Sequence, residues 1–216
     1  GQRSALVAIG VCEFAGDVAN AHELIRRANL AKESALGPGL RRYEAKLDQQ
    51  VKRRDQMSRA LIKALENDEL ALHYQPILRG CGGPMLACEA LARWHSEEFG
   101  FVSPGEFIPL TEGSPHLCRT FTRWVLNQAC RAALEWNLGM PHPVAVTINI
   151  AGSEFYRQGF VADVEEALMT TGLARDLLII EVTEQTLIQH IDDAVGTLHQ
   201  LRWRGVRCAL DDFGTG

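Results

Sequence analysis

The 216-residue sequence lacks several features, and each absence excludes a class of protein. No apolar run is long enough to cross a bilayer and no signal-peptide pattern opens the chain, so the sequence predicts no membrane segment. Basic residues are not in excess, because 22 Lys and Arg stand against 27 Asp and Glu, and a net charge of -5 argues against a groove for a nucleic-acid polymer. Low-complexity segments and internal repeats are also absent. With 46% hydrophobic and 23% charged residues, the chain is predicted to be a globular protein.

The six cysteines form no CxxC pair and no regular framework. Most of them lie in apolar stretches, so we expect reduced, buried thiols and a cytoplasmic location. The seven histidines are scattered; His190 and His199 are nine residues apart, which is not the spacing of two metal ligands on one turn.

Both ends of the sequence are expected to be cut. A strand-like run at residues 5–14 follows Gly1 almost directly, and the chain stops at Asp-Asp-Phe-Gly-Thr-Gly (211–216), which reads as a functional loop. We therefore expect a segment of a longer protein, in which upstream segments could provide a membrane anchor.

Hydrophobic spacing predicts a small first part and a long connector. It predicts a strand at 5–14 and a helix at 17–36, and the helix is expected to end at Gly-Pro-Gly (37–39). Residues 43–70 contain neither Gly nor Pro and are densely charged, with a narrow apolar stripe. They predict a helix that would span about 38 Å over roughly 25 residues and would connect two domains.

The rest of the chain predicts an α/β fold. Two strands at 69–78 and 85–94 are joined by a Gly-rich turn, and helices follow at 103–110 and 117–137. Strands and helices then alternate, which is typical of βαβ units with a parallel sheet. The expected strands are at 144–150, 177–183 and 206–211, and the expected helices at 160–171 and 191–204.

Several predicted strands carry an oxygen-bearing side chain where a buried parallel strand is normally apolar. Such a group is costly unless it binds something. Residues two apart share a face of a strand, and chemistry in α/β barrels lies at the carboxyl ends of strands. Oxygen donors of this kind suit Mg²⁺ or Mn²⁺ rather than Zn²⁺, and a second ion beside the first would neutralise a phosphodiester. The candidates are Glu89, Asn149, Glu181 and Asp211 for one ion, with Asp212 facing the volume of the second.

Arg93 is predicted to share a face with Glu89 and Leu91. Because arginine binds phosphate through two parallel hydrogen bonds, this pattern indicates a phosphate clamp beside a cation site. An ion pair between Glu89 and Arg93 within the sheet explains the same two residues, and the sequence leaves both explanations open.

From about residue 61 to its end, the sequence resembles the EAL domain of cyclic di-GMP phosphodiesterases. The matching motifs are Tyr-Gln-Pro-Ile (74–77), Glu-Ala-Leu (89–91) with Arg93 and Trp94, Val-Ser-Pro-Gly-Glu-Phe-Ile-Pro (102–109), Asn149, Glu-Val-Thr-Glu (181–184) and Asp-Asp-Phe-Gly-Thr-Gly (211–216). The resemblance implies a modified TIM-like (β/α)₈ barrel whose first strand is antiparallel to its neighbours, of which this chain holds about the first five strands.

The resemblance also implies roles for single residues and a reaction, the hydrolysis of cyclic di-GMP to pGpG with Mg²⁺ or Mn²⁺ at a two-metal site. It implies metal ligands at Glu89, Asn149, Glu181, Asp211 and Asp212, of which Glu89, Asp211 and Asp212 are catalytic. It implies substrate contacts at Gln75, Leu91, Arg93 and Pro104, with Arg93 on the phosphate.

Residues 1–43 resemble the C-terminal part of a GGDEF (diguanylate cyclase) domain, through a strand at 7–11 and the helix at 28–36. Asn29, Glu33 and Leu36 depart from that family's pattern, so this part is not expected to make cyclic di-GMP. The expected domains are a GGDEF remnant at 1–43, a helical linker at 44–60 and the N-terminal part of an EAL domain at 61–216.

Three functions stay open on these grounds. The first, which the retained metal ligands favour, is a segment of a phosphodiesterase that forms a homodimer through the EAL domain or the connector helix. The second is a receptor that binds cyclic di-GMP without hydrolysis, and the third is a structural or dimerisation module. Because the family's catalytic lysine and further acids would follow Gly216, we expect the isolated chain to hydrolyse cyclic di-GMP negligibly.

Overall fold

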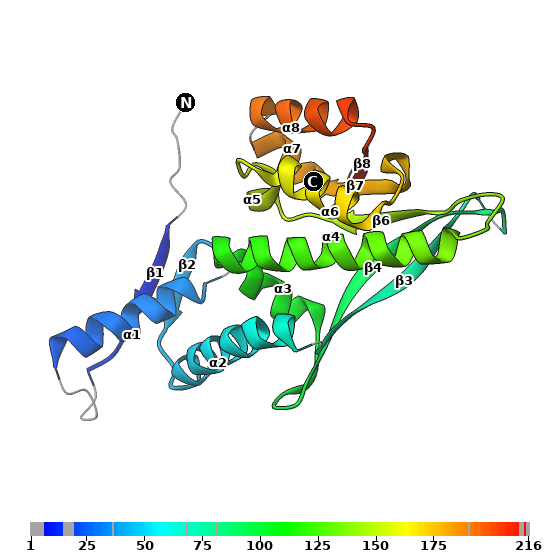
Figure 1. The fold of residues 1–216 in the computed structure, drawn as a ribbon. Helices are drawn as coiled ribbons and strands as arrows, with labels where there is room; N and C mark the ends of the chain where they lie inside the picture. Colours follow the sequence, from blue (N-terminus) through cyan, green and yellow to red (C-terminus); the bar gives the residue numbers. More distant parts are fainter. Residues whose placement is uncertain are drawn as a thin grey trace. The chain divides into compact units, whose positions relative to one another are not determined.

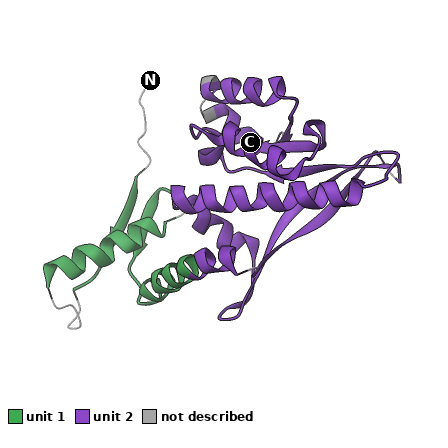
Figure 2. Cartoon of the chain, viewed as in Figure 1, with its two compact units in different colours: residues 1–59 green, residues 60–216 purple. Residues whose placement is uncertain are grey.

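The computed structural model describes residues 7–14, 20–35, 37–67, 69–80, 82–189, 191–211 and 214. The chain divides into two compact units, residues 1–59 and 60–216 (Figure 2). The boundary falls inside helix α2 (Lys46–Glu66), so one continuous helix belongs partly to each unit. Its 21 residues correspond to about 32 Å, somewhat shorter than the sequence predicted.

Unit 1 is a small α/β arrangement built on two parallel strands. Besides the first part of α2, its elements are strand β1 (Ala8–Val11), helix α1 (Ala21–Glu33) and strand β2 (Gly39–Arg42). Asn20 begins α1, because its side chain accepts a hydrogen bond from the Glu23 amide at 3.0 Å. Helix α1 lies so close to β1 that a β-carbon on Gly10 would be 1.8 Å from the carbonyl oxygen of Ala28. Strand β2 was not predicted, because all of its residues are exposed and carry no alternating pattern.

Unit 2 contains a six-stranded sheet in the order β3-β4-β6-β7-β8, with β5 paired to β4 (Figure 1). The strands are β3 (Leu70–Leu78), β4 (Met85–Ser96), β5 (Gly100–Val102), β6 (Ala145–Asn149), β7 (Leu178–Thr183) and β8 (Arg207–Asp211). Strand β3 is antiparallel to β4, whereas β4, β6, β7 and β8 are parallel to one another. The antiparallel first strand and the run of five strands agree with the expected part of a modified barrel. Among the described residues, β8 pairs only with β7 and forms an edge.

Helices follow the strands as the alternation predicted. They are α3 (Pro104–Glu112), α4 (Pro115–Asn137), α5 (Gly152–Phe155), α6 (Phe160–Thr171), α7 (Glu184–Gln189) and α8 (Ile191–Trp203), and a 3₁₀ turn η1 (Arg175–Leu177) precedes β7. The predicted helices correspond to α3, α4, α6 and α8; the short α5, α7 and β5 are additions.

The two faces of the unit 2 sheet have different surroundings. One face packs against α4, α6 and α8 in the main hydrophobic core, through strand residues such as Ala90, Ile148 and Ile180. The opposite face carries a small apolar cluster of Ala87, Ala145 and Ile179. All three residues lie near the amino-terminal halves of their strands, which leaves the carboxyl-terminal halves of this second face for polar side chains.

Three of the five described cysteines, Cys88, Cys118 and Cys130, are buried as expected, whereas Cys12 and Cys208 are partly exposed. Cys12, Cys88, Cys118, Cys130 and Cys208 are all free. Burial raises the pKa of Cys130 to about 12, so its thiol is held protonated. Cys81 and His190 lie outside the described residues. Within the described part of the chain, none of the helices combines the length and hydropathy that a membrane crossing requires.

Candidate functional site

The strand register brings the predicted oxygen donors to one face of the sheet. Side chains of directly paired residues share a face, as do residues two apart on a strand. The pairs are Glu89 with Thr147, Asn149 with Glu181, and Thr183 with Asp211. The resulting set on the second face is Glu89, Thr147, Asn149, Glu181 and Asp211. Asn149 and Asp211 end their strands, so the set lies toward the carboxyl edge of the parallel sheet.

The side chains of this set interact with one another. Asn149 Nδ2 donates a hydrogen bond of 2.7 Å to Glu89 Oε1. The pKa of Glu181 is raised, mainly because the carboxyl group is buried, and the negative charges of Glu89 and Asp211 raise it further. The Thr147 hydroxyl lies near enough to the Glu181 carboxyl to lower this pKa by hydrogen bonding, although the two groups are not in good hydrogen-bond geometry. Glu89 and Asp211 are therefore both close enough to the Glu181 carboxyl for their charges to act on it.

The donor chemistry of this set fits a hard divalent cation. Carboxylate and amide oxygens are the ligands that Mg²⁺ and Mn²⁺ take, and a cation would remove the mutual repulsion of the acids. The described side chains do not form a complete coordination shell. Within the described ranges, no three His, Cys, Asp or Glu side chains form a group that could hold a metal ion. Asp212, expected at the second ion, lies outside the described residues.

A cavity of about 380 Å³ adjoins this set and contains most of the expected substrate contacts. Its lining includes Leu91, Arg93 and Pro104 together with Asn149 and Glu181. A cavity of this size accommodates part of a nucleotide ligand, and an arginine in its wall offers a cationic group to a phosphate.

Arg93 does not form the ion pair that the sequence left open. Its Nη1 donates a hydrogen bond of 2.9 Å to the carbonyl oxygen of Ala92, and no ion pair joins it to Glu89 in the described part of the chain. The guanidinium group is half-buried in the cavity wall rather than neutralised by the neighbouring acid. The arrangement therefore favours the phosphate-clamp explanation.

Gln75 is the expected contact that the cavity does not include. It is exposed and pairs with Glu89 across the antiparallel β3–β4 ladder, so it shares the face of the acids. It therefore lies beside the carboxylates rather than in the cavity wall that holds Arg93.

The sequence did not identify the back wall of the cavity, which comes from two helices. Apolar side chains of α3 and α4, including Ile108, Phe121 and Val125, line it. The motif at 102–109 pointed to α3, but nothing in the periodic apolar pattern of α4 separates a residue that lines a cavity from one in the core.

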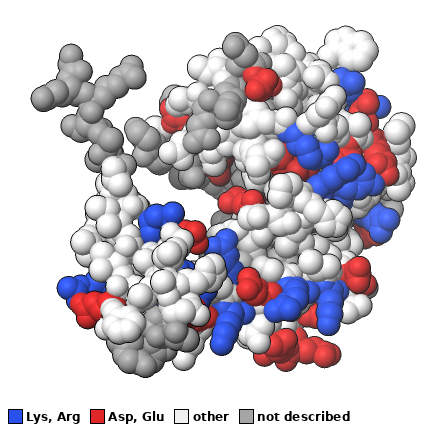
Figure 3. Space-filling view, turned by 90° about the vertical axis from the view of Figure 1, so that its left-hand side faces the viewer, with Lys and Arg blue, Asp and Glu red and all other residues white. Residues whose placement is uncertain are grey.

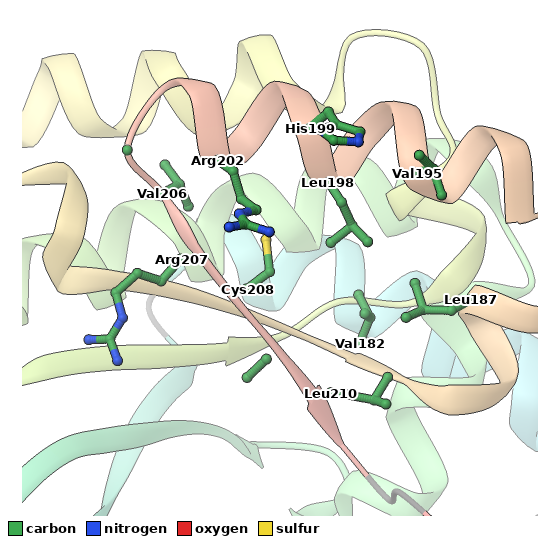
Figure 4. Close-up of a pocket in the computed structure, with 12 residues that line it drawn as sticks. Val182, Leu187, Val195, Leu198, His199, Arg202, Val206, Arg207, Cys208 and Leu210 are labelled. Carbon is green, nitrogen blue, oxygen red and sulfur yellow. The ribbon is translucent and has the colours of Figure 1, made fainter.

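A second cavity, of about 640 Å³, lies at the sheet edge between β8, α7 and α8 (Figure 4). Val182, Leu198 and Leu210 contribute apolar side chains to it, and His199 and Arg202 come from α8. It contains none of the predicted site residues, and its larger volume does not make it the candidate site. Charged groups of both signs are interspersed on the molecular face in Figure 3, so that face offers no broad basic area for a nucleic-acid polymer.

Comparisons with known proteins agree with this geometry. A family model described as the EAL domain matches residues 58–216. MucR of Pseudomonas aeruginosa, named a bifunctional diguanylate cyclase/cyclic di-GMP phosphodiesterase, is 35% identical over 211 residues, which are 96% of this chain and 31% of MucR. NbdA of the same organism, named a cyclic di-GMP phosphodiesterase, is 35% identical over 211 residues, 96% of this chain and 27% of NbdA.

The fold is also similar to solved structures. A structure of the MucR phosphodiesterase in complex with c-di-GMP matches with a TM-score of 0.71 and 38% identity, over 74% of this chain and 65% of that one. The chain thus spans less than a third of the length of MucR and of NbdA, and about two thirds of the solved MucR chain.

Proposed function

The chain belongs to the EAL domain family, and we propose that it is part of a metal-dependent phosphodiesterase that hydrolyses cyclic di-GMP to pGpG. The relatives support the substrate, because NbdA is named for this activity and the solved MucR phosphodiesterase holds c-di-GMP. The single observation that carries the proposal is a set of acids on one sheet face, in which Glu89 and Asp211 act on Glu181, beside a cavity whose Arg93 forms no ion pair among the described residues.

In this proposal Arg93 binds a phosphate oxygen of the dinucleotide, while Leu91 and Pro104 form an apolar wall against which the nucleotide packs. Gln75 contacts the substrate from the neighbouring strand. Holding the phosphodiester in one orientation lowers the entropic part of the barrier.

Five residues are proposed to hold Mg²⁺ or Mn²⁺. When bound, such an ion activates a water molecule and neutralises charge on the phosphodiester. Glu89, Asp211 and Asp212 would provide carboxylate oxygens to the ions, and Asn149 holds Glu89 in place through the hydrogen bond between their side chains. The proposed metal ligands are Glu89, Asn149, Glu181, Asp211 and Asp212.

The proposal is tested by separating binding from hydrolysis in the protein that contains this chain. R93A should weaken cyclic di-GMP binding about 10- to 100-fold, because hydrogen bonds to charged groups contribute about 1.5–3 kcal/mol. R79A is the matched control, since Arg79 is an exposed arginine in the turn between β3 and β4 and lies outside the cavity. E89A should abolish Mn²⁺-dependent release of pGpG, followed by chromatography. Normal hydrolysis by E89A would refute the assignment of the acids, and equal binding by R93A and R79A would refute the phosphate clamp.

One observation favours a second candidate function, a receptor that binds cyclic di-GMP without cleaving it. Three of the four expected substrate contacts, Leu91, Arg93 and Pro104, already share one cavity, whereas the described acids form no group of three that could hold an ion. Stoichiometric binding by the native protein with no pGpG formed in saturating Mn²⁺ would favour the receptor over the enzyme.

For unit 1 we propose the remnant of a GGDEF domain at residues 1–43, joined by a helical linker at 44–60. The match to MucR supports this, because it covers 96% of the chain and MucR is named partly as a diguanylate cyclase. We also propose that the EAL domain or the connector helix mediates a homodimer, which light scattering would test.

A further inference from the structure

Thr147 carries a buried hydroxyl group that the fold itself does not use. The residue lies in β6 with 1% of its surface exposed, and its Oγ1 lies near the Glu181 carboxyl but makes no hydrogen bond of good geometry among the described residues. A buried polar group without a partner is destabilising. The other core positions of β6 are apolar, so a valine here would fill the same space without that cost.

The surroundings of Thr147 point to what the hydroxyl serves. On its face of the sheet it pairs with Glu89 on β4, and it precedes Asn149 by two residues. Because Asn149 pairs with Glu181, the Glu181 carboxyl lies diagonally across from Thr147. The position directly opposite on β7 is Ile179, which offers no side-chain acceptor.

We propose that Thr147 is a positioning residue, whose hydroxyl donates a hydrogen bond to the Glu181 carboxylate when a divalent cation binds Glu89, Asn149 and Glu181. The inference rests on the proposed function, because it needs the metal site. A carboxylate that gives one oxygen to a cation keeps a second oxygen that needs a donor, and such supporting hydrogen bonds orient metal ligands.

A merely structural explanation is that threonine is a β-branched residue suited to a strand and that its hydroxyl is incidental. The two explanations predict opposite signs for T147V. If the hydroxyl positions Glu181, T147V loses metal affinity yet is at least as stable as the native chain in EDTA, because an unpaired polar group has been removed. If the hydroxyl supports the metal-free fold, T147V is less stable in EDTA.

The test is a Mn²⁺ titration of the 216-residue chain, with free Mn²⁺ followed by electron paramagnetic resonance, beside urea unfolding in EDTA. T147V should bind Mn²⁺ about 10- to 100-fold more weakly, the usual effect of losing a residue that supports a metal ligand. T147S, which keeps the hydroxyl, should recover most of the affinity. An unchanged unfolding midpoint, or a higher one, is expected for T147V in EDTA.

The outcomes that overturn the inference are distinct from the failure of the proposed function. If the native chain binds Mn²⁺ and T147V binds it equally well, only the role of Thr147 is overturned. A T147V chain that unfolds more easily in EDTA, or does not fold, also overturns it, because the hydroxyl then supports the metal-free fold. A native chain that binds no Mn²⁺ overturns both this inference and the metal site of the proposed function.

Discussion

Replacing Asp163 in unit 2 should destabilise the protein, because its buried carboxylate pairs with several arginines. Its side chain is only 4% exposed and accepts hydrogen bonds from three arginines. Arg123 Nη1 lies 2.6 Å from Oδ1 and Arg119 Nη2 lies 3.1 Å from it, while Arg157 binds Oδ2. Arg157 also pairs with Glu154 at 2.7 Å, in the short helix α5 that follows Asn149. The cluster therefore ties α4 and α6 to the segment after the candidate site.

The magnitude for D163N follows from how deeply each partner is buried. Breaking a buried ion pair typically costs about 3–5 kcal/mol, because a charge is left uncompensated. Here Arg123 keeps Glu166, Arg157 keeps Glu154, and Arg119 is about half exposed, so we expect the low end, about 3 kcal/mol. For a protein of this size, that lowers the melting temperature by about 6–12 °C.

The assay is thermal and urea unfolding of D163N beside E166Q, a variant that removes one exposed charge from the same cluster. Glu166 is 55% exposed, and an exposed ion pair contributes about 0–1 kcal/mol, so E166Q should shift the melting temperature by less than about 4 °C. Equal shifts in D163N and E166Q would refute the reasoning, because burial would then make no difference to the energy of the pair.

The pH dependence of the same variant provides an internal check. Burial by itself would raise the pKa of Asp163, but hydrogen bonds from the three arginines outweigh it and hold the pKa below its ordinary value of 3.8. A carboxyl with a lowered pKa in the folded state stabilises the protein above its ordinary pKa, and that contribution is lost as pH falls through the lowered value. The difference in free energy of unfolding between the native chain and D163N should therefore have its full value at pH 7 and should decrease below about pH 4.

Two further expectations follow from the site and from unit 1. In EDTA at pH 7, E181Q should unfold at a higher urea concentration than the native chain, because burial and then the charge of Glu89 raise the pKa of Glu181. The difference in urea midpoint should disappear near pH 4, where the folded and unfolded states both hold the proton. A difference that stays constant with pH would contradict this. G10A should destabilise unit 1 by about 1–3 kcal/mol or more, because the added carbon would overlap the backbone of Ala28, whereas G37A meets no atom within 4 Å and is the control. Amide hydrogen exchange of α1 measures the second effect, and equal protection in G10A and G37A would argue against close packing of α1.

The sequence predicted the long elements of unit 2 well because each of them buries one face. Helices α4, α6 and α8 and strands β3, β4, β6, β7 and β8 all appeared within a few residues of their expected bounds. The missed elements, β2, β5, α5 and α7, are at most six residues long. Such segments are too short to show a period, and tertiary contacts determine their conformation.

The candidate site was predictable to the level of a strand face but not to the level of contacts. Alternation along single strands assigned Glu89, Asn149, Glu181 and Asp211 to faces. It could not show that Arg93 forms no ion pair with Glu89 among the described residues, or that the Thr147 hydroxyl makes no hydrogen bond of good geometry there, because both depend on the geometry between neighbouring strands. A single sequence does not directly specify which residues of two neighbouring strands are paired.

Register in this sheet is fixed mainly by residues on the face opposite to the candidate site. Ile148 and Ile180 pack into the main core, and each is the immediate neighbour of a proposed metal ligand, Asn149 or Glu181. A slip of one residue in either strand would expose the isoleucine of that strand and bury a polar side chain in the core, Asn149 in β6 or Glu181 in β7, so the apolar face strongly selects the pairing that aligns these two residues. The register of strand β8 is less strongly selected, because Leu210 is partly exposed at the edge cavity rather than enclosed in the core. The position of Asp211 therefore depends more on pairing with β7 than on packing, and it is the proposed ligand whose placement is least fixed by the hydrophobic core.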